Sequence, residues 1–322
     1  METRYDIVAI GELLVDMTPY GSSNDKRPLF EANAGGAPCN VVVMAQRLGS
    51  RCAFIGKVGH DAFGDMLIST VRDLGIDASG VCRAEKIPTT LALIALDENN
   101  ERSFSFYRNP GADSMLNAAD VSEEQVAAGS ILHFGAMSLM GGESRAAVIS
   151  AMDTAKKHGR MLSFDPNIRE FLLADEERLR DTLEYGFSNC NILKLSDDEL
   201  LYCTGIKDPN KAADALINAH PNIGVFFLTM GARGCLVVNG GEHITVPGFL
   251  QPRVVDTTGA GDAFYGVCLS SLAGMRLSEL DAAYLRETAL KANAAGAIIT
   301  GRRGALLSMP SAGDIAKMIG RA

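Results

Sequence analysis

The sequence predicts an α/β fold with a three-layer α/β/α core, built on a mostly parallel sheet, together with a small second β-sheet. Short continuous apolar segments alternate with amphipathic segments through most of the 322 residues, which is typical of parallel strands covered by helices on both faces. Two regions interrupt this alternation with strand-like sequence of a different kind. A chain that is 47% hydrophobic and 21% charged has the composition of a globular protein with a sizeable core.

The expected core strands are short apolar runs, at residues 7–10, 53–58, 131–134, 162–164, 192–195, 225–229 and 236–238. The expected helices have apolar residues at helical spacing, at residues 40–48, 63–74, 144–158, 175–185, 197–203, 211–219, 263–273, 279–299 and 312–319.

The two interrupting regions are residues 12–34 and 89–109, which we expect to form a β-sheet able to act as a lid. The core would then consist of residues 1–11, 35–88 and 110–322.

Within the second region, residues 91–96 and 102–108 read as a hairpin around a turn at residues 97–100. Phe104, Phe106 and Arg108 alternate along its second strand, which predicts a half-exposed antiparallel sheet. The alternative interpretation is that these strands lengthen the main sheet.

Charge and cysteine content exclude several classes of protein. The net charge is −9 and the basic residues are scattered, which disfavours a nucleic-acid partner because a phosphate backbone needs a clustered basic surface. Seven cysteines with no C-x-x-C pair indicate reduced, mostly buried thiols, and with five dispersed histidines we expect no transition metal. No apolar run reaches the ~20 residues that span a membrane, and no apolar signal core is evident, so we expect a cytoplasmic protein.

The most informative segment is DTTGAGDAF at residues 256–264, which follows Val254 and Val255 and runs into a predicted helix. Its glycines let backbone N–H groups at the positive end of the helix approach a guest closely, which favours a phosphate oxygen. Asp262 would repel such a guest, but a carboxylate beside a phosphoryl group can take a proton from the attacking hydroxyl. The plainer interpretation is a first-turn acid that complements the helix dipole.

A second segment, NAGGAPCN at residues 33–40, leads into another predicted helix. Gly35 and Gly36 let a polyol approach the backbone, and Asn40 offers a donor and an acceptor. The alternative is an ordinary helix start with proline in its first turn.

GGAPCN followed far downstream by DTTGAGDAF resembles the two signature motifs of the ribokinase/PfkB family of carbohydrate kinases. Four intermediate segments agree and extend the resemblance over essentially the whole chain, at residues 58–64, 164–169, 228–234 and 292–305. The resemblance implies a ribokinase-like α/β core with a β-sheet lid, ATP as phosphate donor, magnesium, and phosphorylation of a sugar hydroxyl.

Several site residues follow from the family motifs. Asp262 corresponds to the catalytic base, and Gly259, Ala260 and Gly261 to the anion hole, where Gly261 also borders ATP. The sugar-contacting positions of the family match Asp16, Gly35, Gly36 and Asn40. Without the resemblance, Asp16 would read as a solvated acid at a strand end.

Further matches lie on the nucleotide side. Thr229, Gly231 and Gly234 correspond to a loop beside the nucleotide, and Asn293 lies where a C-terminal helix borders adenine. As structure alone, residues 229–234 read as a tight turn between strands. A second group, Asp256 and Thr258, matches positions near a monovalent-cation site, where potassium is the candidate ion.

One motif departs from the family pattern. Many members carry Asn-x-x-Glu near the magnesium and the phosphates, whereas this chain has Ser196 and Glu199, preceded by Lys194. A lysine at this position resembles the fructokinase branch and would place a compact positive charge near the ATP phosphates. Ser196 and Glu199 can also form a capping box at a helix start, and the two interpretations are compatible.

Substrate choice rests on the predicted lid, whose residues 101–113 closely resemble fructokinases. Phe106 and Tyr107 point to opposite faces of a strand, so one can cover the apolar face of a sugar, although sheet packing explains an aromatic residue equally well. Arg108 and Arg169 offer planar donor groups for hydroxyls, carboxylates or phosphate.

We therefore expect an ATP-dependent fructokinase that converts D-fructose to fructose 6-phosphate with Asp262 as general base. The alternatives are a 2-keto-3-deoxygluconate kinase or another sugar kinase of the family, and more remotely a catalytically silent sugar-sensing protein on the same fold. The expected partners are a small-molecule sugar and ATP, with no nucleic acid and no membrane. A homodimer through the lid is a further candidate, because a lid sheet has edges and an open face to cover.

Overall fold

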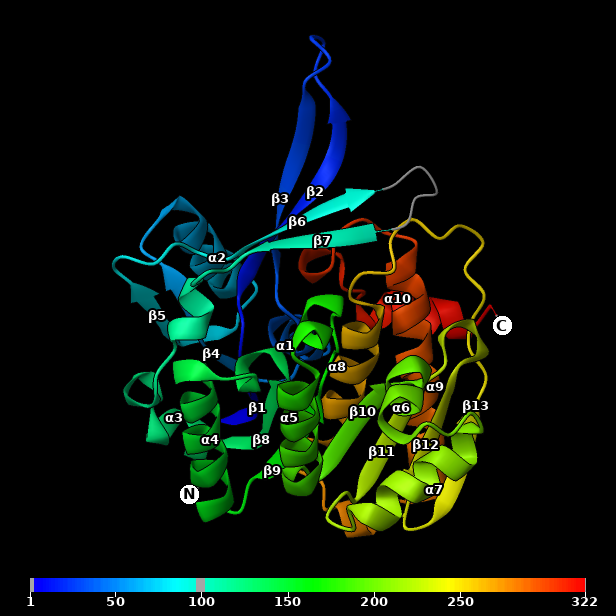
Figure 1. Cartoon of the computed structure of the whole chain (residues 1–322). Coiled ribbons are helices and arrows are strands. Elements are labelled where there is room, and N and C mark those ends of the chain that lie inside the picture. Colours follow the sequence, from blue (N-terminus) through cyan, green and yellow to red (C-terminus); the bar gives the residue numbers. More distant parts are fainter. Residues whose placement is uncertain (1–2, 97–101, 322) are drawn as a thin grey trace.

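The computed structural model describes residues 3–96 and 102–321. Its core is a nine-stranded sheet with helices on both faces, and a smaller sheet rises from one edge of this core (Figure 1). In spatial order the large sheet consists of β13 (Glu242–Val246), β12 (Cys235–Asn239), β11 (Val225–Thr229), β10 (Ile192–Ser196), β9 (Met161–Asp165), β8 (Gly129–Gly135), β1 (Tyr5–Ile10), β4 (Cys52–Gly59) and β5 (Asp77–Ala84).

The large sheet is parallel from β5 to β11, and only β12 and β13 run antiparallel to their neighbours. Its central strands are almost wholly buried, as their continuous apolar sequences predict. The predicted mostly parallel α/β core is therefore confirmed.

Helices divide between the two faces of the large sheet according to which apolar side chains they bury. One cluster of buried side chains holds the inward faces of α1 (Ala37–Arg47), α2 (Ala62–Asp73), α8 (Ala260–Leu272), α9 (Ala282–Thr300) and α10 (Ala312–Ile319). The other holds those of α3 (Glu123–Ala127), α4 (Gly142–Lys157), α5 (Glu176–Asn189), α6 (Asp197–Thr204) and α7 (Pro209–Ala219).

The two interrupting regions form a separate four-stranded sheet, so the interpretation that they lengthen the main sheet is wrong. Its order is β3 (Pro28–Gly35), β2 (Leu14–Ser22), β6 (Leu91–Leu96) and β7 (Arg102–Tyr107). The outer pairs are antiparallel as predicted, whereas the central pair β2 and β6 is parallel. The β2–β3 hairpin extends well beyond the core (Figure 1).

Two elements of the large sheet were not predicted, namely its edge strands β5 and β13. The predicted turn at residues 97–100 lies outside the described residues. Within the described ranges, no helix combines the length and the apolar character needed to cross a membrane.

Candidate active site

The first turn of helix α8 forms the floor of the candidate site. Gly259 precedes the helix with a φ of 79°, a left-handed conformation that favours glycine, and it supplies no side-chain cap. The N–H of Ala260 binds the carbonyl of Thr257, and that of Ala263 begins the helical pattern by binding the carbonyl of Gly259. The N–H groups of Gly261 and Asp262 therefore have no acceptor within the helix and are available to an anion.

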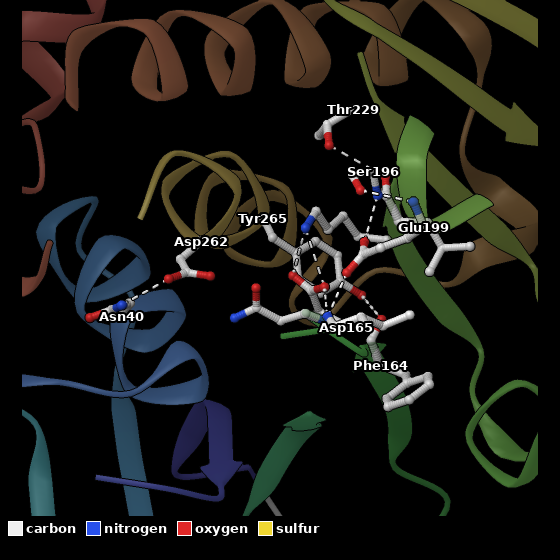
Figure 2. Close-up of polar contacts among 12 residues, drawn as sticks. Asn40, Phe164, Asp165, Ser196, Glu199, Thr229, Asp262 and Tyr265 are labelled. Atoms are coloured by element: carbon white, nitrogen blue, oxygen red, sulfur yellow. Dashed lines mark hydrogen bonds and ion pairs between the residues drawn. The ribbon is translucent and has the colours of Figure 1, made fainter. Parts of the chain in front are cut away.

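Asp262 is the third residue of α8 and is 4% exposed. Its Oδ2 accepts a hydrogen bond of 2.8 Å from Nδ2 of Asn40 on α1, and Figure 2 shows the two side chains facing each other. Burial raises the pKa of Asp262, while the charge of Arg169, the Asn40 bond and the charge of Lys194 oppose that rise. The two signature motifs, 222 residues apart in the chain at this contact, thus meet at one hydrogen bond.

Asn40 is buried and has one polar atom to spare. Its Nδ2 donates to Asp262, but its Oδ1 is shielded from solvent and has no hydrogen-bond partner among the described residues. A buried acceptor without a partner is costly, so this atom is suited to a donor that a ligand brings.

Lys194, in the middle of β10, lies directly beside the first turn of α8. It is 4% exposed, and its Nζ lies 3.0 Å from Oδ2 of Asp165 at the end of β9. Burial opposes its charge, but the carboxylates of Asp165, Glu199 and Asp262 outweigh burial and hold the pKa of Lys194 above its ordinary value. A Cβ on Gly261 would lie 3.0 Å from this Nζ, so the glycine makes room for the ammonium group.

A pocket on one side of Asn40 contains most of the predicted sugar-contacting residues. It lies between the carboxyl end of β1, the start of α1 and the small sheet. Its lining residues include Glu12, Leu14, Asp16, Gly36, Asn40, Phe106, Asn167, Arg169 and Thr258. We call it the acceptor pocket.

Both glycines before α1 are required by close contacts. A Cβ on Gly35 would come within 2.2 Å of Oδ2 of Asp16, and one on Gly36 within 2.3 Å of the carbonyl oxygen of Glu12. Gly36 also has a φ of 121°. The two glycines therefore let β2, β3 and α1 converge around the acceptor pocket.

Two carboxyl groups line the acceptor pocket, where Glu12 is buried and Asp16 is half-buried. Burial raises the pKa of Asp16 to about 7, against the opposing charge of Arg169. Burial likewise raises the pKa of Glu12 to about 7. Both groups can donate as well as accept a hydrogen bond near neutral pH, which suits recognition of hydroxyl groups.

Of the two predicted arginines, the structure brings only Arg169 to the acceptor pocket. Arg108 does not line it, because its Nε donates a 2.7 Å hydrogen bond to the buried Asp113. Thr90, just before β6, donates to the same carboxylate. Arg108 and Asp113 thus fasten the base of the β6–β7 hairpin to the core.

A second, larger pocket begins on the other side of the α8 turn and contains the predicted phosphate-side residues. We call it the phosphate pocket, and its lining residues include Arg169, Lys194, Ser196, Glu199, Tyr202, Thr229, Gly231, Thr258, Gly259, Ala260, Gly261 and Asp262. Asn167, Arg169 and Thr258 line this pocket and the acceptor pocket, so the two adjoin. Asp262 lies at this junction, because it lines the phosphate pocket and is bonded to Asn40 of the acceptor pocket.

Glu199 forms the capping box considered from the sequence. Its backbone N–H donates to Oγ of Ser196, and its Oε2 accepts a 2.7 Å hydrogen bond from the N–H of Ser196. Its Oε1 accepts a 2.7 Å bond from the N–H of Ile168. Glu199 therefore fixes the start of α6 and the segment after β9 while it lines the phosphate pocket.

A third pocket continues from the phosphate pocket and is more apolar. Thr229 and Gly231 line both, and Gly234 and Asn293 line only the third. The Nδ2 of Asn293 donates to the carbonyls of Val246 and Pro247, at 3.1 Å each. Gly234 has a φ of 99°, and a Cβ there would come within 2.1 Å of the carbonyl of Val246.

The loop before α8 is held by Asp256, which is 6% exposed. Its Oδ1 accepts a 2.7 Å hydrogen bond from the N–H of Thr258. The preceding residues, Val254 and Val255, are exposed loop residues rather than a buried strand. Among the described residues, no group of three or more His, Cys, Asp or Glu side chains is arranged to hold a metal ion.

Two site residues were missed from the sequence, namely Glu12 and Asp165. Each follows or ends a buried parallel strand, and the carboxyl ends of such strands meet at one edge of the sheet. That rule, applied to β1 and β9, would have indicated both carboxylates.

Comparisons with known proteins agree with this geometry. The sequence profile of the pfkB family carbohydrate kinases matches residues 4–312. Fructokinase-1 of Zea mays is 38% identical over 319 residues, which cover 98% of each chain. Fructokinase-2 of Solanum habrochaites is 38% identical over 312 residues, covering 96% of this chain and 94% of the other.

Solved structures give the same result. The fructokinase of Xylella fastidiosa with bound ATP superposes with a TM-score of 0.86 at 29% identity, covering 98% of this chain and 99% of the other. The fructokinase of Vibrio cholerae O395 in a fructose-, ADP- and calcium-bound form has a TM-score of 0.84 at 30% identity, covering 97% and 98%. From the two signature motifs, the shared fold and these relatives, the chain belongs to the pfkB family of carbohydrate kinases.

Proposed function

We propose that this protein is an ATP-dependent fructokinase, which transfers the γ-phosphate of ATP to the 6-hydroxyl of D-fructose. The observation that carries the proposal is the position of Asp262, where the acceptor pocket and the phosphate pocket adjoin. The fructokinases of Zea mays and Solanum habrochaites, each 38% identical to this chain, support the choice of sugar.

In the proposed reaction Asp262 takes the proton of the acceptor hydroxyl as that oxygen attacks the γ-phosphate in line. The N–H groups that the α8 turn leaves free, those of Gly261 and Asp262, and the ammonium group of Lys194 stabilise the negative charge that develops on the transferred phosphoryl group. Asn40 orients the base Asp262, and Oδ1 of Asn40 accepts a hydrogen bond from a sugar hydroxyl.

The remaining sequence-predicted residues take roles according to their pockets. In the proposal Asp16, Gly36, Phe106 and Arg169 surround the sugar, whereas Gly35 does not line the acceptor pocket and makes room for the carboxylate of Asp16. Thr229, Gly231, Gly234 and Asn293 border the nucleoside part of ATP. Arg108 acts through Asp113 and holds the hairpin that carries Phe106.

A divalent metal ion, which we propose to be Mg²⁺, would enter with the nucleotide. Mg²⁺ is usually bound by one or two carboxylates together with substrate phosphates, and Asp197, Asp198 and Glu199 line the phosphate pocket. When bound, the ion neutralises phosphate charge. We further propose that a potassium ion binds near Asp256 and Thr258, which the assay described below tests by omitting potassium.

The acceptor pocket favours a neutral sugar over the keto-acid alternative. Glu12 and Asp16 face a single arginine, Arg169, among the described lining residues. A carboxylate on the acceptor would therefore meet more acidic than basic groups.

We also propose that the small sheet closes over the sugar and joins two copies of the chain into a homodimer. Its strands expose Tyr20, Leu29, Phe30 and Tyr107, which are large apolar side chains of the kind found at interfaces.

The deciding experiment is a coupled assay of ADP release with fructose, ribose, adenosine and 2-keto-3-deoxygluconate, run with and without potassium. We expect the highest kcat/KM with fructose. A higher kcat/KM with the keto-acid would show that the keto-acid, and not fructose, is the substrate. Sugar binding without ADP release would support the silent sugar-sensing protein instead.

A further inference from the structure

Tyr265 is a buried side chain on α8 that the proposed reaction does not use. It follows Asp262 by three residues, so the two side chains lie on the same side of the helix, one turn apart. Its side chain is fully buried and points from α8 toward β9 and β10, near Asp165 (Figure 2).

The hydroxyl of Tyr265 ends a directed chain of hydrogen bonds. Oγ of Ser163 donates to Oη of Tyr265 at 2.7 Å, and Oη donates to the carbonyl of Ile192 at 3.1 Å, with the carbonyl of Phe164 as a longer acceptor at 3.4 Å. Nδ1 of His133 lies 3.1 Å from the same Ser163 Oγ. Because the single proton of Ser163 goes to Tyr265, Nδ1 of His133 must carry the proton that it gives to Ser163.

The partners of Tyr265 lie on the same two strands as the Lys194–Asp165 ion pair. Ile192 precedes Lys194 by two residues on β10, and Ser163 precedes Asp165 by two residues on β9. Residues two apart on a strand point to the same face of the sheet. The Tyr265 hydroxyl therefore binds both strands one pleat away from the two residues that form the Lys194–Asp165 ion pair.

This network carries no charge. Burial lowers the pKa of His133 to about 3, and burial holds the pKa of Tyr265 well above its ordinary value. Both groups are neutral near pH 7, so the network does not act by adding charge to the reacting groups. The network instead holds α8 in a fixed position against β9 and β10.

We propose that Tyr265 is a positioning residue that fixes helix α8, with Asp262 and the anion-binding turn, relative to Lys194 and Asp165 on the two strands. The inference rests on the proposed function, because it assigns Tyr265 to the alignment of base, phosphate and cation. Loss of alignment lowers the rate of transfer more than it lowers the binding of either substrate.

The test is Tyr265→Phe, which removes only the hydroxyl and keeps the ring contacts with His133 and Phe227. We expect kcat to fall about tenfold or more, with KM for both substrates changed less than about threefold. The matched control is Tyr284→Phe, whose lost hydroxyl donates to the carbonyl of Ser271 at 2.6 Å, near the opposite end of α8. We expect this control to keep the wild-type kcat.

A second variant, Ser163→Ala, tests whether the network acts as a unit. Tyr265 keeps its bond to Ile192 in this variant, so we expect a smaller loss of kcat than in Tyr265→Phe. The double variant should be no slower than Tyr265→Phe alone, because coupled residues are not additive. Additive losses would overturn the coupling of Ser163 and Tyr265.

All rates are measured per folded molecule, with folding followed by circular dichroism, on the sugar of the panel that the wild type phosphorylates best. A Tyr265→Phe enzyme with wild-type kcat, or with only a lower melting temperature, overturns the positioning role and leaves the fructokinase proposal intact. A wild type that prefers another sugar overturns fructose as the substrate. The positioning role is then tested by comparing Tyr265→Phe with the wild type on that other sugar. A wild type that phosphorylates none of the sugars overturns both proposals.

Discussion

At the scale of single residues, the same tripeptide has two different roles in this chain. Ala-Gly-Asp opens helix α8 at residues 260–262 and helix α10 at residues 312–314. In α10 the N-cap Ser311 forms a capping box with Asp314, which is also paired with Arg302, and these backbone and side-chain bonds lower the pKa of Asp314 to about 2. In α8 the N-cap is Gly259 and the acid is buried, so its pKa is raised instead. The residue before the tripeptide, and the burial of the acid, separate a helix cap from a candidate base.

This comparison gives the control for the proposed base. We expect Asp262→Asn to lower kcat by about a thousandfold or more, because general-base catalysis contributes roughly 10²- to 10⁴-fold. Nucleotide affinity should be retained, since the substitution removes a negative charge beside the phosphates. Steady-state kinetics and calorimetric binding of ADP check both points.

Asp314→Asn, at the same position of α10, is the matched substitution. It should lower thermal stability slightly and leave kcat unchanged. An Asp262→Asn enzyme that keeps near-wild-type turnover would show that Asp262 is, like Asp314, only a first-turn acid.

Sequence alone predicted the residues whose role is local. Asp262 and Asn40 each belong to a motif that is complete within nine residues, so both were predicted before their contact was known. The pairing of Lys194 with Asp165 could not be predicted in this way, because it depends on the register of β9 against β10. The bond between Arg108 and Asp113 could not be predicted for a similar reason, since the fold decides which carboxylate lies beside the arginine.

At the scale of elements, the start of helix α8 combines free N–H groups with room for a neighbouring cation. Gly261 leaves its N–H open and leaves room for the ammonium group of Lys194. Alanine has the higher helix propensity, by about 1 kcal/mol in a helix interior, so the glycine is kept at some cost in stability.

We therefore expect Gly261→Ala to fold at least as stably as the wild type but to lose about tenfold in kcat, because a displaced cation is less well aligned with the transferred group. Its Cβ would lie 3.0 Å from Nζ of Lys194, so the ammonium group would have to shift by a few tenths of an ångström. Gly313→Ala, at the same position of α10, meets only the Oγ of Ser311 at 3.7 Å and should keep full activity. Equal activity of the two variants would contradict the role given to this turn.

Sequence reasoning missed the short helix α3 and two strands, and both strands lie at the edges of the large sheet. β5 contains Asp, Ser and Gly, and β13 is a short strand with alternating exposure. An edge strand has one neighbour and needs less apolar sequence than a central strand, so its signal is weak. The central strands, buried on both faces, were predicted within one or two residues in most cases.

At the scale of the whole molecule, the small sheet presents the apolar surface proposed as a dimer interface. We expect the wild type to sediment as a dimer at micromolar concentration, and Phe30→Asp to sediment as a monomer. Leu201→Asp changes a side chain of similar exposure on α6, 40% against 42% for Phe30, and should remain dimeric. A wild type that is monomeric at every concentration would remove the proposal, while the acceptor pocket, formed within one chain, would stand.

The strands of the small sheet contribute to one pocket only. Leu14, Asp16 and Phe106 line the acceptor pocket, whereas no described residue of β2, β3, β6 or β7 lines the phosphate pocket or the more apolar pocket beyond it. The molecule is thus modular. Substitutions within these four strands can alter which acceptor is admitted without replacing any residue assigned to phosphoryl transfer, because those residues all lie on the core.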